Sequence, residues 1–600
     1  SRPWNQFAIL LSNEEGETLL SYQGNWRDIF QNWEALLLSY PEFIENVIAK
    51  FVNASTVDGY NPYRISNEGI DWEVEEPDDP WSYIGYWGDH QIIYLQKLLE
   101  LSRQFHPTRL SGMLLQATFS YANVPYRIKP IEEQLRNAKS TVIFDEEEAQ
   151  RIEQRVAKLG ADGRLLLDSQ GQVYQVTLLE KLLVPLLSKL GNLVVDGGIW
   201  LNTQRPEWND ANNALVGQGL SMVTLYYLRR YINFMSQLLE DLPTTVSLSA
   251  EVSQWLVETS EALGRMRMQL GDKPVDARLR YRSLLELGEA SSRYRHGVYR
   301  SRSLSGPVAQ GLELLTAMLD DALATIDQSI SSNQREDGLY HAYNLMVLRG
   351  KTVEVEHLYP MLEGQVAVLG SGTIAPAEAV LLLDALFESD LFRKDQNSFL
   401  LYPDRDLPGF LQKNHVPAKS VHALPLLGRM LEEGDHRIIE HDSGGIYRFN
   451  ADLTNVDALN GKLDRLAPEY GEIADAARPP LHEPYDPVFT PKAVNGRSGG
   501  MFGFEGLGSI YWHMVSKLLL AVQECFFNAL EQGPDADACQ QLGDFYYRIR
   551  SGIGFNKTPE EYGAFPTDPY SHTPQHAGAQ QPGMTGQVKE EILTRFGELG

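Results

Sequence analysis

The sequence is poor in cysteine and in basic residues, and it has no long hydrophobic run. Only Cys525 and Cys539 occur among 600 residues, which excludes a disulfide framework or a cysteine-based metal site and indicates a reducing compartment, the cytoplasm. Lysine and arginine number 52 against 80 acidic residues, a net charge of -28. A nucleic-acid partner is therefore not expected, because a phosphate backbone needs clustered basic side chains. No apolar run approaches the ~20 residues that span a bilayer, so no membrane partner is expected either.

The length of the chain exceeds what a single hydrophobic core needs, so one large domain with insertions or several smaller domains are expected. With 43% hydrophobic and 22% charged residues, the composition is typical of a globular protein. Both ends, Ser1 and Gly600, are expected to be cuts inside a longer protein. We divide the chain into an N-terminal segment leading from a preceding domain (1–25), one main domain (26–555) with an insertion at about 105–176, and a polar loop with the start of a C-terminal segment (556–600). The oligomeric state stays open, with a homodimer as one expectation.

Helical spacing of apolar residues dominates the chain. It predicts helices over residues 27–40, 89–101, 146–159, 177–190, 211–239, 249–270, 306–331, 374–390, 418–433, 509–532 and 535–551. Strands are few: a short one at 7–11 and a hairpin that joins 164–167 to 172–175 through a turn at 169–171. Many helices of similar length, joined alternately by short and by long aromatic-rich loops, predict a mainly α fold. The expected arrangement is a double ring of helices, an (α/α)-type barrel with small β-hairpin insertions.

The most distinctive loop is polar and aromatic and lies between two long helical segments, at residues 197–213. Glu207 and Asp210 flank Trp208 and Asn209 there. A flat indole beside an amide and a carboxyl group is suited to holding a sugar ring and protonating its glycosidic oxygen. Asp210 also suits the N-cap of the helix predicted to start at about Ala211. The local sequence supports both interpretations equally.

Three further places combine polar groups. Arg27, Asp28 and Gln31 share one face near the start of a predicted helix, where they either point into a cavity or form a solvated first turn. Asp89 opens the next helix, and alone it fits a cap better than a catalyst. The glycine-rich stretch 495–509 leads straight into a helix, which makes it either an anion site or a surface turn.

The order of several short motifs resembles the inverting glycoside phosphorylases, the cellobiose, laminaribiose and chitobiose phosphorylases. Trp208-Asn209-Asp210 is similar to their general-acid motif, residues 26–32 to their donor-site segment, and Gly88-Asp89-His90 to a segment one helix later. Residues 443–447 and 505–511 fall where those enzymes place two phosphate-binding stretches. The longer segment 205–215 is most similar to the corresponding segment of the long-chain β-1,3-glucan phosphorylases.

This resemblance implies an (α/α)6-barrel catalytic domain over 26–555 that releases α-glucose 1-phosphate from β-glucosidic bonds with inversion, and β-1,3 is the expected linkage. The implied partners are a β-glucan oligosaccharide and inorganic phosphate as co-substrate, with no other cofactor and no metal. Asp210 would be the catalytic acid. Substrate-binding residues would be Arg27, Asp28, Gln31, Asp89, Glu207, Trp208 and Asn209. Phosphate-binding residues would be Arg448, Arg497, Gly506, Gly508 and Ser509.

The chain departs from that family pattern at three places. Glu207 stands where the family has Asp, Arg448 and Phe449 stand near a missing phosphate-binding histidine, and Glu505 stands where a threonine is usual. A carboxylate across the sugar from Asp210 is what an inverting hydrolase uses as its base. Two alternatives therefore stay open: a hydrolase of the same fold with Glu505 as base, and a non-catalytic carbohydrate-binding helical domain.

Overall fold

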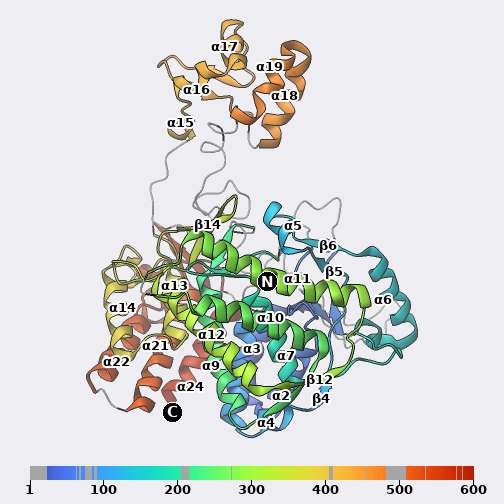
Figure 1. Ribbon diagram of the computed structural model, residues 1–600. Helices are drawn as coiled ribbons and strands as arrows, with labels where there is room; N and C mark the ends of the chain where they lie inside the picture. Colours follow the sequence, from blue (N-terminus) through green and yellow to red (C-terminus); the bar gives the residue numbers. More distant parts are fainter. Residues whose placement is uncertain are drawn as a thin grey trace, which may run out of the picture. The chain divides into compact units, whose positions relative to one another are not determined.

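The computed structural model is mainly helical, with small sheets, as the sequence predicts (Figure 1). The structure describes residues 23–62, 64–66, 69–74, 84–86, 91–203, 215, 217–271, 273–403, 410–453, 456–481, 485, 508–533, 536–575, 577–583 and 585–599. The finer prediction, an (α/α)6 barrel, stays a proposal. The predicted strand at 7–11 lies outside the described residues.

The chain forms two compact units, residues 1–404 with 503–600 and residues 405–502. The sequence did not indicate this second unit, and the boundaries predicted at 25 and 555 stay predictions. The smaller unit has its own apolar core, which includes Leu427, Phe449 and Leu463. Its elements are α15 (Phe410–Lys413), α16 (Ala418–Ala423), α17 (Pro425–Glu432), β17 (Ile439–His441), β18 (Tyr447–Phe449), α18 (Val456–Tyr470) and α19 (Glu472–Ala476).

Six helices of the larger unit pack against one another in a closed cycle. They are α1 (Trp26–Ser39), α3 (Gln91–Phe105), α9 (Met222–Leu239), α13 (Leu362–Gly370), α21 (Trp512–Gln532) and α24 (Thr585–Leu599). Each contacts the next in this order, and α24 contacts α1. We call these helices the six-helix cycle. All nine residues of α13 are buried, which explains why its sequence has no polar face.

Further helices pack around these six. The helix α2 (Ile44–Asn53) contacts α3, α12 (Leu312–Ser331) contacts α9, and α14 (Pro376–Glu388) and α22 (Ala536–Ser551) contact α21. The helix α7 (Leu178–Leu190) has no exposed residue, because α2, α10 (Ala250–Arg267) and α11 (Ala277–Ser301) pack on it. The remaining helices are α4 (Arg109–Met113), α5 (Ile131–Arg136), α6 (Glu146–Leu159) and α23 (Pro559–Tyr562).

The strands form small antiparallel sheets. The largest has the order β14-β13-β10-β9-β8, built from β8 (Leu193–Val194), β9 (Gly198–Trp200), β10 (Gly219–Ser221), β13 (Tyr343–Arg349) and β14 (Thr352–His357). A three-stranded sheet joins β19 (Ser509–Tyr511), β20 (Tyr570–Pro574) and β21 (Gln580–Pro582), and another joins β1 (Gln23–Asn25), β2 (Arg64–Ser66) and β3 (Gly69–Asp71). Four two-stranded ribbons complete the larger unit: β4 (Ala117–Phe119) with β7 (Val176–Thr177), β5 (Tyr126–Ile128) with β6 (Val142–Phe144), β11 (Thr245–Ser249) with β12 (Pro307–Gly311), and β15 (Phe392–Arg393) with β16 (Ser398–Phe399).

Several helices are entered directly from a strand, which corrects the helix starts predicted at 306 and 509 and interrupts the helix predicted as continuous over 211–239. Residues 219–221, 307–311 and 509–511 are strands rather than helical turns. At α9 the reason is local, because the Ser221 hydroxyl accepts a hydrogen bond from the Thr224 amide at 3.0 Å and caps the helix there. The predicted 418–433 helix is also wrong as one piece. Pro425 disfavours a helical Leu424, which has an extended backbone between α16 and α17.

The longest helix, α11, was not predicted. It buries Arg280, Ser283, Ser291 and Arg295 on its core face, so apolar periodicity is weak there. Arg280 is satisfied internally: it donates to the carbonyls of Val195 and Val353 and pairs with Asp196 at 3.2 Å. The predicted 164–175 hairpin is confirmed by the antiparallel bridge of Leu167 with Val173.

None of the described helices combines the length and the apolar character that a membrane span requires. Within the same described ranges, no three His, Cys, Asp or Glu side chains gather in a way that could hold a metal ion. Cys525 and Cys539 are both buried and unbonded to each other.

Candidate functional site

The six-helix cycle has one end at which its helices begin. At α13 and α21, the Leu362 amide donates to the Leu401 carbonyl at 3.1 Å, and the Leu401 amide donates to the Ser509 carbonyl at 3.0 Å. At α9 and α13, the Tyr343 hydroxyl donates to the Glu363 carboxylate at 3.0 Å, and the Met222 amide donates to the Ala342 carbonyl. The starts of α9, α13 and α21 therefore lie together.

The starts of α1, α21 and α24 meet at a second set of contacts. The Gln31 amide nitrogen lies 2.9 Å from Nε2 of His513. Gly586, in the first turn of α24, packs against both, because a Cβ built there would lie 1.7 Å from the Gln31 nitrogen and 2.4 Å from His513 Cε1. Tyr94, near the start of α3, lines one cavity with Met514 from the first turn of α21 and Glu590 from the second turn of α24. All six helices thus begin at the same end, which we call the N-terminal end of the cycle.

Of the sequence-predicted sugar-binding residues, the structure describes the backbone of Arg27 and Asp28 and the whole of Gln31, which lie near the start of α1. Arg27 and Asp28 occupy the first turn of α1, and Gln31 is 3% exposed. Asp89 precedes α3, and Glu207, Trp208, Asn209 and Asp210 precede α9. The side chains of Arg27 and Asp28 and the whole of these loop residues lie outside what the structure describes. Their flanks are anchored, since β9 pairs with β10 with Trp200 opposite Leu220.

Two residues of the predicted phosphate stretch before α21, Gly508 and Ser509, lie at the N-terminal end. Gly508 has a φ of +64°, a left-handed conformation that favours glycine, and Ser509 is buried at the head of β19. Arg497, Glu505 and Gly506 lie outside the described residues. Next to Ser509, β19 pairs with β20 so that Tyr511 lies opposite His572, and their rings stack at 4.9 Å.

Arg448 is placed in the smaller unit, where its guanidinium has local partners. It pairs with Asp442 at 2.7 Å and donates to the carbonyls of Leu411 and Asn414. Asp442 in turn accepts from the amides of Gly444 and Ile446. These contacts show a structural role for Arg448 within its own hairpin, and its predicted phosphate contact stays a prediction.

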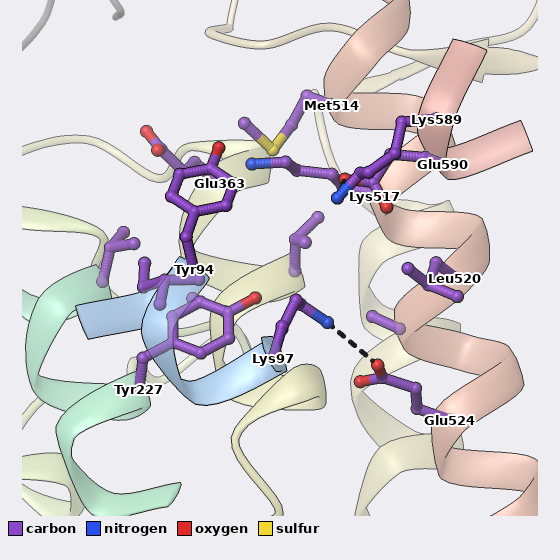
Figure 2. A pocket seen from close by; sticks show the side chains of 15 residues that line it. Tyr94, Lys97, Tyr227, Glu363, Met514, Lys517, Leu520, Glu524, Lys589 and Glu590 are labelled. Carbon is purple, nitrogen blue, oxygen red and sulfur yellow. Dashed lines mark hydrogen bonds and ion pairs between the residues drawn. The ribbon is translucent and has the colours of Figure 1, made fainter. Parts of the chain in front are cut away.

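A charged cavity of about 30 Å³ lies inside the six-helix cycle (Figure 2). It has room for about two water molecules. Figure 2 shows Lys517, Lys589 and Glu590 gathered at one end and the Lys97–Glu524 pair, 3.1 Å apart, at the other. These groups were not predicted, because buried lysine and glutamate at helix positions look like solvated surface residues in a single sequence.

The pKa values of the groups at the Lys517–Lys589–Glu590 end of the cavity depend on burial and on neighbouring polar and charged side chains. Burial opposes ionisation of Glu590, but Lys589, His513 and Lys517 outweigh it and hold the pKa of Glu590 well below its usual range. Burial lowers the pKa of His513 to about 4, with Lys517 and Lys589 adding to the shift and Glu590 opposing it. Burial likewise lowers the pKa of Lys517 to about 8. At neutral pH, His513 is therefore an uncharged hydrogen-bonding group.

This pKa predicts a pH-dependent contribution to stability. The unfolded His513 takes up its proton near pH 6.5, whereas the folded one does so near pH 4, so between these values the unfolded state binds more protons and stability falls as the pH falls. The melting temperature of the wild type relative to His513→Gln should therefore decrease from pH 7 to pH 4.5. A temperature difference that stays constant over this range would contradict the burial of a neutral His513.

The comparisons with known proteins bear on the smaller unit. Residues 407–492 match the family model described as GH149 phosphorylase insertion domain 2. No curated protein matches the chain. The match covers nearly the whole of the unit that separates structurally at residues 405–502.

Proposed function

The chain belongs to the GH149 family of glycoside phosphorylases, enzymes that cleave glycosidic bonds with phosphate. From this premise we propose that it cleaves β-glucosidic bonds of gluco-oligosaccharides, β-1,3 bonds in particular, with inversion. The products are α-glucose 1-phosphate and a shortened oligosaccharide. The observation that carries the proposal is that the six helices of the cycle all begin at the same end. Four separate loops and turns that hold the predicted sugar and phosphate residues all lead into the N-terminal end of one helix cycle.

The proposed reaction needs one acid and one nucleophile. Asp210 gives its proton to the glycosidic oxygen as the bond to the anomeric carbon breaks, and a phosphate oxygen attacks that carbon from the opposite face. Phosphate thereby replaces the water and general base of an inverting hydrolase. For Asp210 to be protonated near neutral pH its pKa must be raised, and burial against the Trp208 indole would raise it.

We propose that the six-helix cycle is the inner ring of an (α/α)6 barrel. The closed contacts from α1 through α24 support this, as do the helices α2, α12, α14 and α22 that pack outside it. In this arrangement the donor glucose lies against Arg27, Asp28, Gln31 and Asp89. Glu207, Trp208 and Asn209 position the acid and the sugar, and phosphate lies against Arg497, Gly506, Gly508 and Ser509.

We further propose that the enzyme works in a reducing compartment such as the cytoplasm. Cys525 and Cys539 are both free. Burial raises the pKa of the Cys525 thiol to about 12, so its reactive thiolate is scarce at neutral pH.

Phosphate dependence is the test of the proposed function. Purified protein incubated with β-1,3- and β-1,4-gluco-oligosaccharides should release glucose 1-phosphate only when phosphate is present, and NMR should show the α-anomer. Glucose release without phosphate, abolished by Glu505→Gln, would establish the hydrolase instead. No product from a folded protein under any condition would overturn the catalytic assignment.

A further inference from the structure

A buried contact joins the two halves of the proposed site. Gln31 belongs to the donor-sugar side, and His513 follows the Gly508–Ser509 phosphate stretch by one short strand. Their side chains are 3% and 2% exposed and meet at 2.9 Å. The Tyr511 hydroxyl lies 3.5 Å from the other ring nitrogen of His513. The imidazole is therefore placed between the donor side and the strand that leads from the phosphate stretch.

A chain of buried charges lies beside the imidazole. Nε2 of His513 lies 3.8 Å from the Glu590 carboxylate. Lys589 bonds to Glu590 at 2.8 Å and to Glu34 at 2.7 Å, so the chain returns to α1, the helix that carries Gln31. The second oxygen of Glu590, Oε2, is buried without a hydrogen-bond partner. Since α1, α21 and α24 all contribute, the position of the ring is set by tertiary packing.

We propose that His513 is a positioning residue of the donor-sugar site, holding one end of the Gln31 amide so that its other end is presented to a hydroxyl of the donor glucose. This inference rests on the proposed function. As placed, the amide NH2 of Gln31 donates to the unprotonated Nε2 of a neutral His513, which leaves the amide oxygen to accept from the sugar. A side chain fixed on one side by a buried partner loses little entropy when it binds on the other.

Gly586 is the third member of this arrangement. The 1.7 Å approach that a Cβ would make to the Gln31 nitrogen means that a larger residue must displace the amide or the imidazole. Gly586→Ala therefore disturbs the same contact from a different helix, without removing either hydrogen-bonding group.

A double-mutant cycle tests the proposal. With glucose 1-phosphate as donor and a gluco-oligosaccharide as acceptor, Gln31→Ala and His513→Phe should each lower kcat/KM, by about 10²-fold where the donor is misplaced. Because His513 acts through Gln31, the double variant should be no worse than Gln31→Ala alone. His513→Gln, which keeps an amide near the position of Nε2, should retain most of the wild-type activity.

The outcomes separate this inference from the function on which it rests. A wild type without phosphorolysis overturns the proposed function, whereas an active wild type whose two single effects multiply in the double variant overturns only the role of His513. If His513→Phe does not fold, Gly586→Ala replaces it in the same cycle. His106→Phe is the matched control, since His106 pairs with Glu45 beyond the opposite end of α3 and its loss should leave kcat/KM unchanged.

Discussion

Asp210→Asn should lower phosphorolysis by about 10²–10⁴-fold, the usual contribution of a general acid. Asparagine keeps the size and shape of the side chain but cannot donate the proton that the departing glycosidic oxygen needs. It is also as good an N-cap as aspartate. If Asp210 only capped the helix, the variant would therefore keep its activity, so this single change separates the two roles that the local sequence left open.

The leaving group provides an internal check on Asp210→Asn. A glucoside whose leaving group is already a weak base needs little protonation, so its cleavage by the variant should fall much less than that of a gluco-oligosaccharide. The melting temperature should stay close to that of the wild type. Glu207→Gln is the matched control, because it should weaken the positioning of the sugar and lower the cleavage of both substrates alike. If Asp210→Asn also lowered the cleavage of both substrates equally, its role as the acid would be contradicted.

The sequence predicted best the elements whose signals are local. α6 (Glu146–Leu159) begins and ends as predicted, because Asp145 caps it and Gly160 follows it. α7 starts one residue after its predicted beginning, with Thr177 as its cap. The helix predicted over 211–239 is not continuous, because Gly219–Ser221 pairs with β9 and β13, and this pairing depends on residues outside the segment.

The predicted site likewise combines residues that a local pattern indicates with contacts that only distant parts of the chain determine. Gln31 was predicted as a site residue from its place on one helix face, but its contact His513 lies 482 residues away in the chain, a relation that no spacing reveals. The polar loop predicted within 556–600 contains two strands, β20 and β21, and the start of α24. β20 pairs with β19, about 60 residues earlier, and β21 pairs with β20, while α24 closes the helix cycle. The assignment of Asp210 as the catalytic acid rests on its sequence motif alone, because the loop that carries it lies outside what the structure describes.

Lys589→Met should destabilise the larger unit by about 3–5 kcal/mol, the usual cost of removing one member of a buried charge network. Lys589 is 2% exposed and bonds to Glu34 and Glu590, which are 6% and 2% exposed. Methionine matches its length but leaves two carboxylates buried without their cation. Thermal unfolding should report the loss as a lower melting temperature.

The pH dependence of this loss follows from the same charges. Burial opposes the ionisation of Lys589, but Glu34 and Glu590 raise its pKa above the usual value, so Lys589 is charged at neutral pH in the wild type. Without the cation, burial raises the pKa of the carboxyl groups in the folded state, and stability is lost as the pH rises through those values. The deficit of Lys589→Met should therefore be larger at pH 8 than at pH 5.

Two further variants serve as controls. The triple variant, which adds Glu34→Gln and Glu590→Gln to Lys589→Met, removes the orphaned charges and should restore part of the stability. Lys158→Met, on the exposed side of α6, should change the stability by less than about 0.5 kcal/mol. A triple variant less stable than Lys589→Met would show that the carboxylates, rather than the charge balance among the three groups, hold these helices together.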